Sequence, residues 1–271
     1  MEQSLPSFRN PPLDEVVLGV QFEAPSNYTS VDAASVWEIF KDDFPTVVEM
    51  PRLEPQFETF GGAVAGAGFQ LNFGPGSPKS RLWFVSKDQT HLVQFQDDRF
   101  LINWRKRPNG VDSSQPYPRF EPIVSSFKAY LERLSEFYLS HFGINLAVNQ
   151  AEVSYINLIK HDVLPVGMQV FSFLDLSAFK LEGVNSFFTE AVNDGLGRPI
   201  ARLSHDLQSM FTRDGGSGAY GLSLTYRGRP SGPTVDSAVE FLEAGRKMIV
   251  FRFCDLTTSQ AQEAWGRMRN E

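Results

Sequence analysis

The chain contains one cysteine, Cys254, and four histidines, His91, His141, His161 and His205. A single cysteine excludes an internal disulfide and a zinc site built from several thiolates. The histidines are spread too widely along the sequence to predict a site with two metal ions. No nucleotide-binding or other cofactor motif is found in the sequence. We therefore expect the protein to fold without a metal or an organic cofactor.

Long apolar runs and an excess of positive charge are also missing. No apolar stretch approaches the roughly 18 residues that a membrane-spanning helix needs, and prolines interrupt residues 1–14, which excludes a secretory signal there. The chain has 25 Lys and Arg residues and 32 Asp and Glu residues, which gives a net charge of −7. General binding to nucleic acid or anionic membranes requires clustered cations, so both are disfavoured. We expect a soluble, cytoplasmic protein.

Catalytic motifs are absent too. Ser204, His205 and Asp206 have the residue types of a hydrolase triad, but neighbours on a strand point to opposite faces and do not converge. The glycine-rich stretch 61–68 lacks the Lys-Ser/Thr pair and the helix that follow a phosphate-binding loop. Asp97 and Asp98 fall in an expected turn, where we expect solvent to surround both carboxylates. We assign no catalytic residue and favour a protein without enzymatic activity.

The composition is that of an ordinary globular protein, with 42% apolar and 21% charged residues among 271. Patterns of apolar residues predict an extended arm over 1–13 and then two halves, 14–145 and 146–271. The first half is expected to contain a strand at 15–23, a helix ending at 40, irregular chain at 46–60, strands at 69–73, 81–86, 91–96 and 99–105, and a helix over 120–139. The second is expected to contain strands at 152–160, 184–192, 200–213 and 219–227, a helix over 236–253, and a short helix that a capping box of Ser259 and Gln262 begins.

This order of elements predicts an α+β fold in which antiparallel sheets are each crossed by a long helix. Both halves follow a similar order, strand, helical piece, several strands and long helix, which suggests a structural duplication. In the meander over 81–105, a two-residue turn at Asp97-Asp98 sets Phe95 opposite Phe100, and His91 falls opposite Trp104. These pairs make one apolar face.

The other face of this meander, which we call the half-polar face, mixes apolar and polar side chains. Trp83, Gln94, Asn103 and Arg105 are expected to lie together on it. The mixture is too polar for an ordinary hydrophobic core and too apolar for a surface that is fully exposed to solvent. We expect these four residues to form either the junction between the halves or a surface that binds a ligand or a partner.

Several short motifs occur together: Asn10–Phe22 (NPPLDEVVLGVQF), Phe44-Pro45, Tyr155-Ile156-Asn157, and Leu256-Thr257-Thr258 followed by Trp265-Gly266-Arg267. In this order the chain resembles, over nearly its whole length, a family of bacterial and archaeal proteins described as sporadically distributed. The resemblance implies a common fold and brings no known activity, cofactor or catalytic residue. A patchy distribution suggests passage on mobile elements and favours a role in defence or conflict.

Two hypotheses for the function follow. In the first, the protein is an interaction module whose half-polar face and proline-rich arm bind another protein or a second copy of the chain. In the second, a cavity between helix and sheet binds or hydrolyses a small ligand, with Gln94, Asn103 and Arg105 as polar anchors. The acidic balance and the missing acid–base residues favour the first, whereas a cavity of several hundred Å³ would favour the second.

Overall fold

The computed structural model describes residues 4–61, 80–106, 117–161, 164, 168–174, 183–210 and 218–268. The first half contains β1 (Ser7–Phe8), β2 (Leu13–Phe22), α1 (Asp32–Glu38), β3 (Thr46–Met50), β4 (Arg81–Val85), β5 (His91–Gln96), β6 (Arg99–Arg105), α2 (Phe120–Phe137) and the π-helical turn η1 (Tyr138–Phe142). The second contains β7 (Val148–Lys160), β8 (Asn185–Asn193), β9 (Pro199–Met210), β10 (Ala219–Gly228), α3 (Val235–Leu256), α4 (Ser259–Ala264) and β11 (Arg267–Met268).

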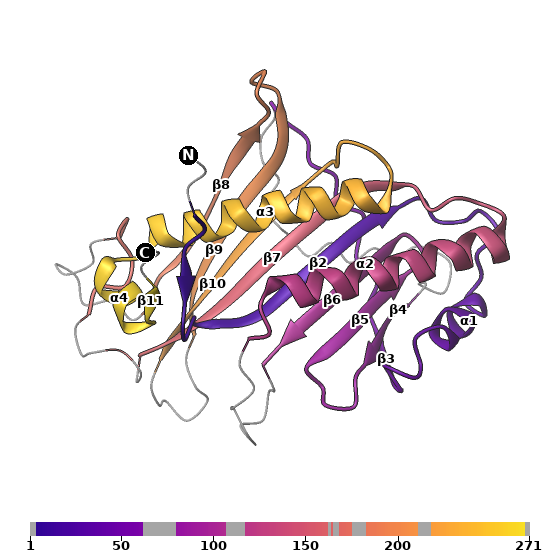
Figure 1. Cartoon of the computed structure of the whole chain (residues 1–271), viewed down its shortest axis with the longest axis horizontal. Helices are drawn as coiled ribbons and strands as arrows, with labels where there is room; N and C mark the ends of the chain where they lie inside the picture. The colour runs from indigo at the N-terminus through magenta and orange to yellow at the C-terminus, as the bar shows by residue number, and fades with distance from the viewer. Residues whose placement is uncertain are drawn as a thin grey trace.

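One antiparallel sheet of nine strands runs through both halves, in the order β3-β4-β5-β6-β2-β7-β10-β9-β8. The long helices α2 and α3 lie on the same face of this sheet (Figure 1). The predicted α+β class is confirmed. Among the described residues, no helix is long and apolar enough to cross a membrane.

The two halves repeat the same strand order. Within this sheet, the first strand of each half pairs with the last strand of that half, β2 with β6 and β7 with β10, and a long helix follows that last strand. The order β4-β5-β6-β2 in the first half therefore matches β8-β9-β10-β7 in the second. Because β2 also pairs with β7, the halves share one sheet instead of presenting two separate ones. This arrangement fits the duplication that the sequence suggests.

The meander has the register that the sequence predicts. Phe95 lies opposite Phe100, His91 lies opposite Trp104, and Trp83 lies beside Gln94. The pairing is predictable because the turn at Asp97-Asp98 is short, and a short turn fixes the register of the strands beside it.

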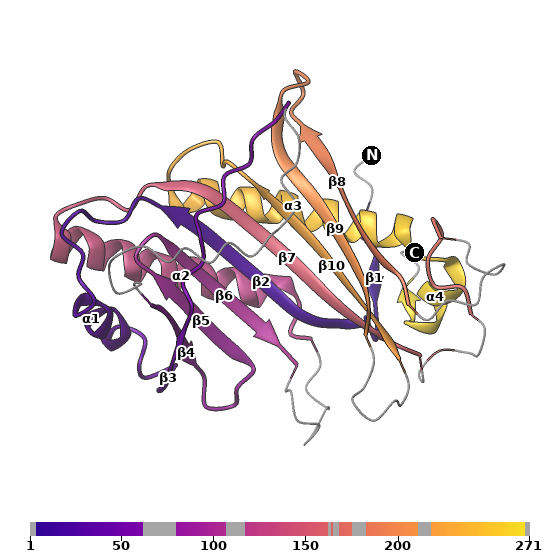
Figure 2. The same ribbon diagram turned by 180° about the vertical axis from the view of Figure 1, so that it is seen from behind.

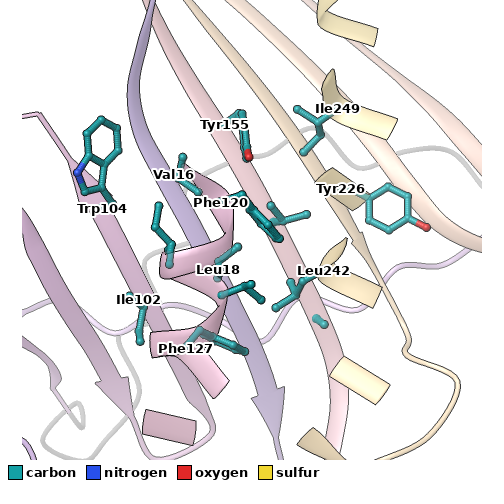
Figure 3. Packing of buried hydrophobic residues seen from close by; sticks show 14 of the residues in the cluster. Val16, Leu18, Ile102, Trp104, Phe120, Phe127, Tyr155, Tyr226, Leu242 and Ile249 are labelled. Carbon is teal, nitrogen blue, oxygen red and sulfur yellow. The ribbon is translucent and has the colours of Figure 1, made fainter. Parts of the chain in front are cut away.

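The core fills the space between the two helices and the sheet. Apolar residues spaced three or four apart on α2 are buried: Phe120, Ile123, Val124, Phe127, Leu131 and Leu134. Figure 3 shows Leu18 of β2 between Phe120 and Phe127 of α2, with Leu242 of α3 alongside. The turn η1 continues α2 and ends at Gly143, whose φ of 72° is the left-handed conformation of a glycine C-cap.

Two local predictions are wrong. Residues 46–50 form the edge strand β3, because Val47 and Val48 pair with β4 before Pro51 removes a backbone N–H. The residue that caps α4 is Thr258, whose hydroxyl accepts from the N–H of Ala261, and not Ser259. The predicted strand at 69–73 and most of the glycine-rich stretch lie outside the described residues.

Candidate functional site

The half-polar face carries a chain of hydrogen bonds that crosses four strands. The Nη1 of Arg81 and the Nε1 of Trp83 both donate to Oε1 of Gln94, over 2.7 and 3.1 Å. The amide nitrogen of Gln94 donates to Oδ1 of Asn103 over 2.8 Å, and that of Asn103 donates to a Glu15 carboxylate oxygen over 2.6 Å. We call these five residues the polar cluster. It lies on the face of the sheet opposite α2 and α3, because its residues alternate with the core residues of their strands.

Arg105 lies at the margin of the polar cluster. It is opposite Glu15 in the β2–β6 register, and its Nε donates to the backbone oxygen of Gln89 over 3.2 Å. Burial raises the pKa of the Glu15 carboxyl, while the hydrogen bond from Asn103 and the charge of Arg105 act in the opposite direction. The structure thus places all four sequence-predicted residues on one face and joins three of them by hydrogen bonds.

The polar cluster lies inside the first half of the protein. Gln94 and Asn103 are only 6% and 4% exposed, so their amides are not presented to solvent. The seam between the halves is the β2–β7 pairing, and β6 and β2 separate Gln94 on β5 from β7. The amides form a buried polar layer in which each bonds its neighbours.

Replacing both amides, Gln94→Ala with Asn103→Ala, is expected to destabilise the fold. Arg81, Trp83 and Glu15 would each lose a partner, and an orphaned buried polar group costs about 1–3 kcal/mol. Urea unfolding should therefore show a clear drop in midpoint. The matched control is Gln208→Ala, which removes an exposed glutamine from β9 of the same sheet and should leave the midpoint unchanged. Equal midpoints for the double variant and the unaltered protein would contradict the role assigned to these amides.

An extended segment, residues 51–61, crosses the same face of the sheet. Figure 2 shows the molecule with this face toward the viewer. We call this segment the strap. Gln96 accepts from the backbone N–H of Leu53 and donates to its carbonyl oxygen, each over 2.9 Å. Gln21 makes the same two bonds with Gln56, over 2.9 and 2.7 Å. Two glutamines of the sheet therefore hold the main chain of the strap.

Ion pairs fasten the two ends of the strap. Arg52 binds both Asp97 and Asp98, and Glu58 binds Arg202 over 2.6 Å. The expectation that solvent surrounds both aspartates of the turn is wrong, since Asp97 is only 3% exposed. The reason is the distant Arg52, which no local pattern connects with this turn.

A pocket of about 400 Å³ lies on the other side of the sheet, among the helices. We call it the arm pocket, because the N-terminal arm (residues 4–12) forms its wall. Figure 1 shows β1 crossing α3 near the end of that helix. The arm is held there by β1–β11 pairing and by bonds from the N–H groups of Arg9 and Asn10 to the carbonyls of Gly266 and Trp265. Much of the lining is apolar: Phe8, Leu13, Ile249, Val250, Phe253 and Met268.

Polar side chains from three segments also line the arm pocket. The hydroxyls of Tyr117 and Tyr155 lie 3.1 Å apart, and Nη1 of Arg246 donates to a Glu121 oxygen over 2.7 Å. The Arg246 guanidinium also lies 4.8 Å from the centre of the Phe120 ring. In Figure 3, Tyr155 of β7 and Ile249 of α3 lie at one end of the apolar cluster. The arm pocket is therefore largely apolar, with polar residues just before and at the start of α2, on β7 and on α3.

The charges of these groups follow from their surroundings. The hydroxyls of Tyr117 and Tyr155 are protonated at neutral pH, and burial raises the pKa of both further above its ordinary value. Burial also acts to raise the pKa of Glu121, but a backbone hydrogen bond and the charge of Arg246 outweigh it and lower that pKa. Glu121 is therefore a carboxylate at neutral pH.

Sequence reasoning missed the arm pocket as a site. The anchors it suggested for a cavity, Gln94, Asn103 and Arg105, lie on the opposite face of the sheet, whereas the lining comes from segments that are distant along the chain. Residues of three short sequence motifs lie at or beside this pocket. Pro11, Leu13, Tyr155 and Asn157 line the arm pocket, and the backbone of Trp265-Gly266 holds the arm.

The other candidate chemistry does not assemble. His205 faces the core and pairs with Glu190 over 3.0 Å, while Ser204 and Asp206 alternate onto the opposite face, as the sequence predicts. Within the ranges that the structure describes, no three His, Cys, Asp or Glu side chains converge as metal ligands would.

Comparisons of the chain with protein-family models, with curated proteins and with solved structures find no match.

Proposed function

We propose that the protein binds a small organic molecule in the arm pocket. The observation that carries this proposal is the pocket itself, with about 400 Å³ of space and a largely apolar lining that also holds a few polar groups. This volume and this mixture are typical of sites for small ligands.

The competing hypothesis, an interaction module that uses the half-polar face, has less support. Gln94 and Asn103 are buried. Their amides are hydrogen-bonded to each other and to Arg81, Trp83 and Glu15. Farther along the same face, the strap takes the side chains of Gln21 and Gln96. A partner would therefore meet few polar groups that are not already bonded within the chain.

Filling the arm pocket should weaken ligand binding strongly without unfolding the protein. Val250 lines the pocket and is half-buried, so Val250→Trp places a large ring in the space that a ligand needs. The neutral fluorophore N-phenyl-1-naphthylamine should bind the unaltered protein saturably, at one site, and the variant at least about tenfold more weakly. Fluorescence titration measures both affinities.

The matched control is Val239→Trp, on the same helix and outside the pocket. It should bind the fluorophore like the unaltered protein. Should Val250→Trp prove unstable, Val250→Phe makes a smaller change in the same direction. Unchanged binding by a folded Val250 variant would overturn the proposal.

A further inference from the structure

We infer that the ligand of the arm pocket is an amphipathic monoanion, a carboxylate with an apolar body, whose acid group Arg246 and the tyrosine pair recognise. This inference rests on the proposed function, since it names the chemical class of the ligand. Three observations support it: the hydrogen-bond donors in the pocket, the net charge of its lining, and the exposed ion pair between Glu121 and Arg246.

Arg246 and the tyrosine pair present hydrogen-bond donors to the pocket. A guanidinium has five N–H donors and no acceptor, in a planar fork that matches a carboxylate. In the tyrosine pair one hydroxyl donates to the other over 3.1 Å, which leaves the second O–H available for a ligand oxygen. Both hydroxyls are protonated at neutral pH, as in any ordinary tyrosine, and burial raises their pKa values further. A group rich in acceptors is therefore the natural complement of this end of the pocket.

The formal charge favours an anion over a cation. Two cations, Arg246 and Arg119, act on the single carboxylate of Glu121, and all three residues line the arm pocket. Within the described part of the chain, Arg119 forms no ion pair with a carboxylate, and its contacts are with the hydroxyl of Ser7 and the backbone oxygen of Phe8, at 3.4 and 3.3 Å. One positive charge is left over, so an acid head would neutralise the site and an ammonium would add to the excess.

Glu121 shows how a carboxylate meets Arg246. Its side chain is 65% exposed, yet it holds Nη1 of Arg246 over 2.7 Å. Because an exposed ion pair contributes little to stability, a ligand acid can displace or share this partner at small cost. The ring of Phe120 lies against the guanidinium, which limits its motion and prepares it for an incoming acid. Glu121 thus acts as a competitor of the ligand within the chain.

Three ten-carbon probes that differ only in the head group test this inference: decanoate, decan-1-ol and decylammonium. Each is titrated against the bound neutral fluorophore. We expect decanoate to displace it at a concentration about tenfold or more below that of decanol, since a charge-assisted hydrogen bond is stronger than a neutral one. Decylammonium should be the weakest of the three.

Two variants show which residues cause the preference for decanoate over decanol. Arg246→Met should raise the displacing concentration of decanoate to that of decanol and leave decanol unchanged. Glu121→Gln should lower the displacing concentration of decanoate by roughly threefold or more, because it removes the competing charge. The exposed Lys247 follows Arg246 on α3, and Lys247→Met removes the same charge as a control without changing the order of the probes. If Arg246→Met does not fold, the Glu121 variant still tests the role of the competing carboxylate, and an unchanged decanoate affinity there counts against the acid class.

The outcomes separate the two proposals. Binding of all three probes at similar concentrations, or a preference for decylammonium, would overturn the acid class and leave the arm pocket as a binding site. A full decanoate preference in a folded Arg246→Met variant would overturn the assignment of the acid group to Arg246, and an unchanged decanoate affinity in Glu121→Gln would contradict the role of Glu121 as a competitor. Failure of the fluorophore and of every probe to bind would overturn the proposed function itself.

Discussion

Replacing Leu131 with Asp is expected to lower the free energy of unfolding by about 3–5 kcal/mol or to prevent folding. Leu131 is 0% exposed on the face of α2 that packs against the sheet. The change removes the burial of a leucine side chain, which contributes about 1.5–3 kcal/mol, and places an unpaired carboxylate among apolar atoms. Urea unfolding followed by circular dichroism measures the loss.

The matched control for this substitution is Ala129→Asp, which adds the same charge to an exposed position of α2. It should change the unfolding free energy by less than about 1 kcal/mol. A Leu131→Asp protein that unfolds at the urea concentration of the control would show that this face of α2 does not contribute to the core.

Gly245→Ala should destabilise the protein by about 1–3 kcal/mol, although alanine is favoured over glycine inside a helix by roughly 1 kcal/mol. A Cβ atom at residue 245 would lie 2.5 Å from Cδ1 of Tyr226 and 2.6 Å from Cγ1 of Val153. Both neighbours are almost fully buried and lie on strands beneath α3. The helix would have to move away from the sheet. Thermal and urea unfolding would record the loss.

A second substitution isolates the cause. Val153→Ala removes the methyl groups that a Cβ at residue 245 would meet, so the double variant should lose less stability than the two single variants added together. Ala244→Gly, on the exposed side of the same turn, reports helix propensity alone. A stabilising Gly245→Ala would mean that α3 does not approach β7 and β10 as closely as described.

Much of the fold could be predicted because its elements are specified locally. The turn at Asp97-Asp98 fixed the register of the meander, and apolar residues at helical spacing located α2. The pairing of β2 with β7, which joins the halves, could not be derived from any local pattern. The strand β3 was missed as well, because Pro51 and Pro55 follow Met50 closely and indicate irregular chain, whereas the strand forms through its pairing with β4.

The candidate site was only partly predictable for the same reason. Alternation along three neighbouring strands was enough to group Trp83, Gln94 and Asn103, whereas Glu15 joins them through the pairing of β2 with β6, far apart in sequence. The arm pocket needs the arm, the start of α2, the middle of β7 and the last turns of α3 together. No spacing within a single segment contains that information.

The way in which Gln21 and Gln96 hold the strap has a consequence for sequence variation. Both glutamines bind peptide groups, so the side chains of Leu53 and Gln56 do not enter these bonds. The strap should therefore accept almost any residue at these two positions and exclude only proline, which has no N–H to donate. The prolines that the strap contains, Pro51 and Pro55, lie where neither glutamine requires a donor. Tolerance to substitution and intolerance to proline thus fall on the same two residues.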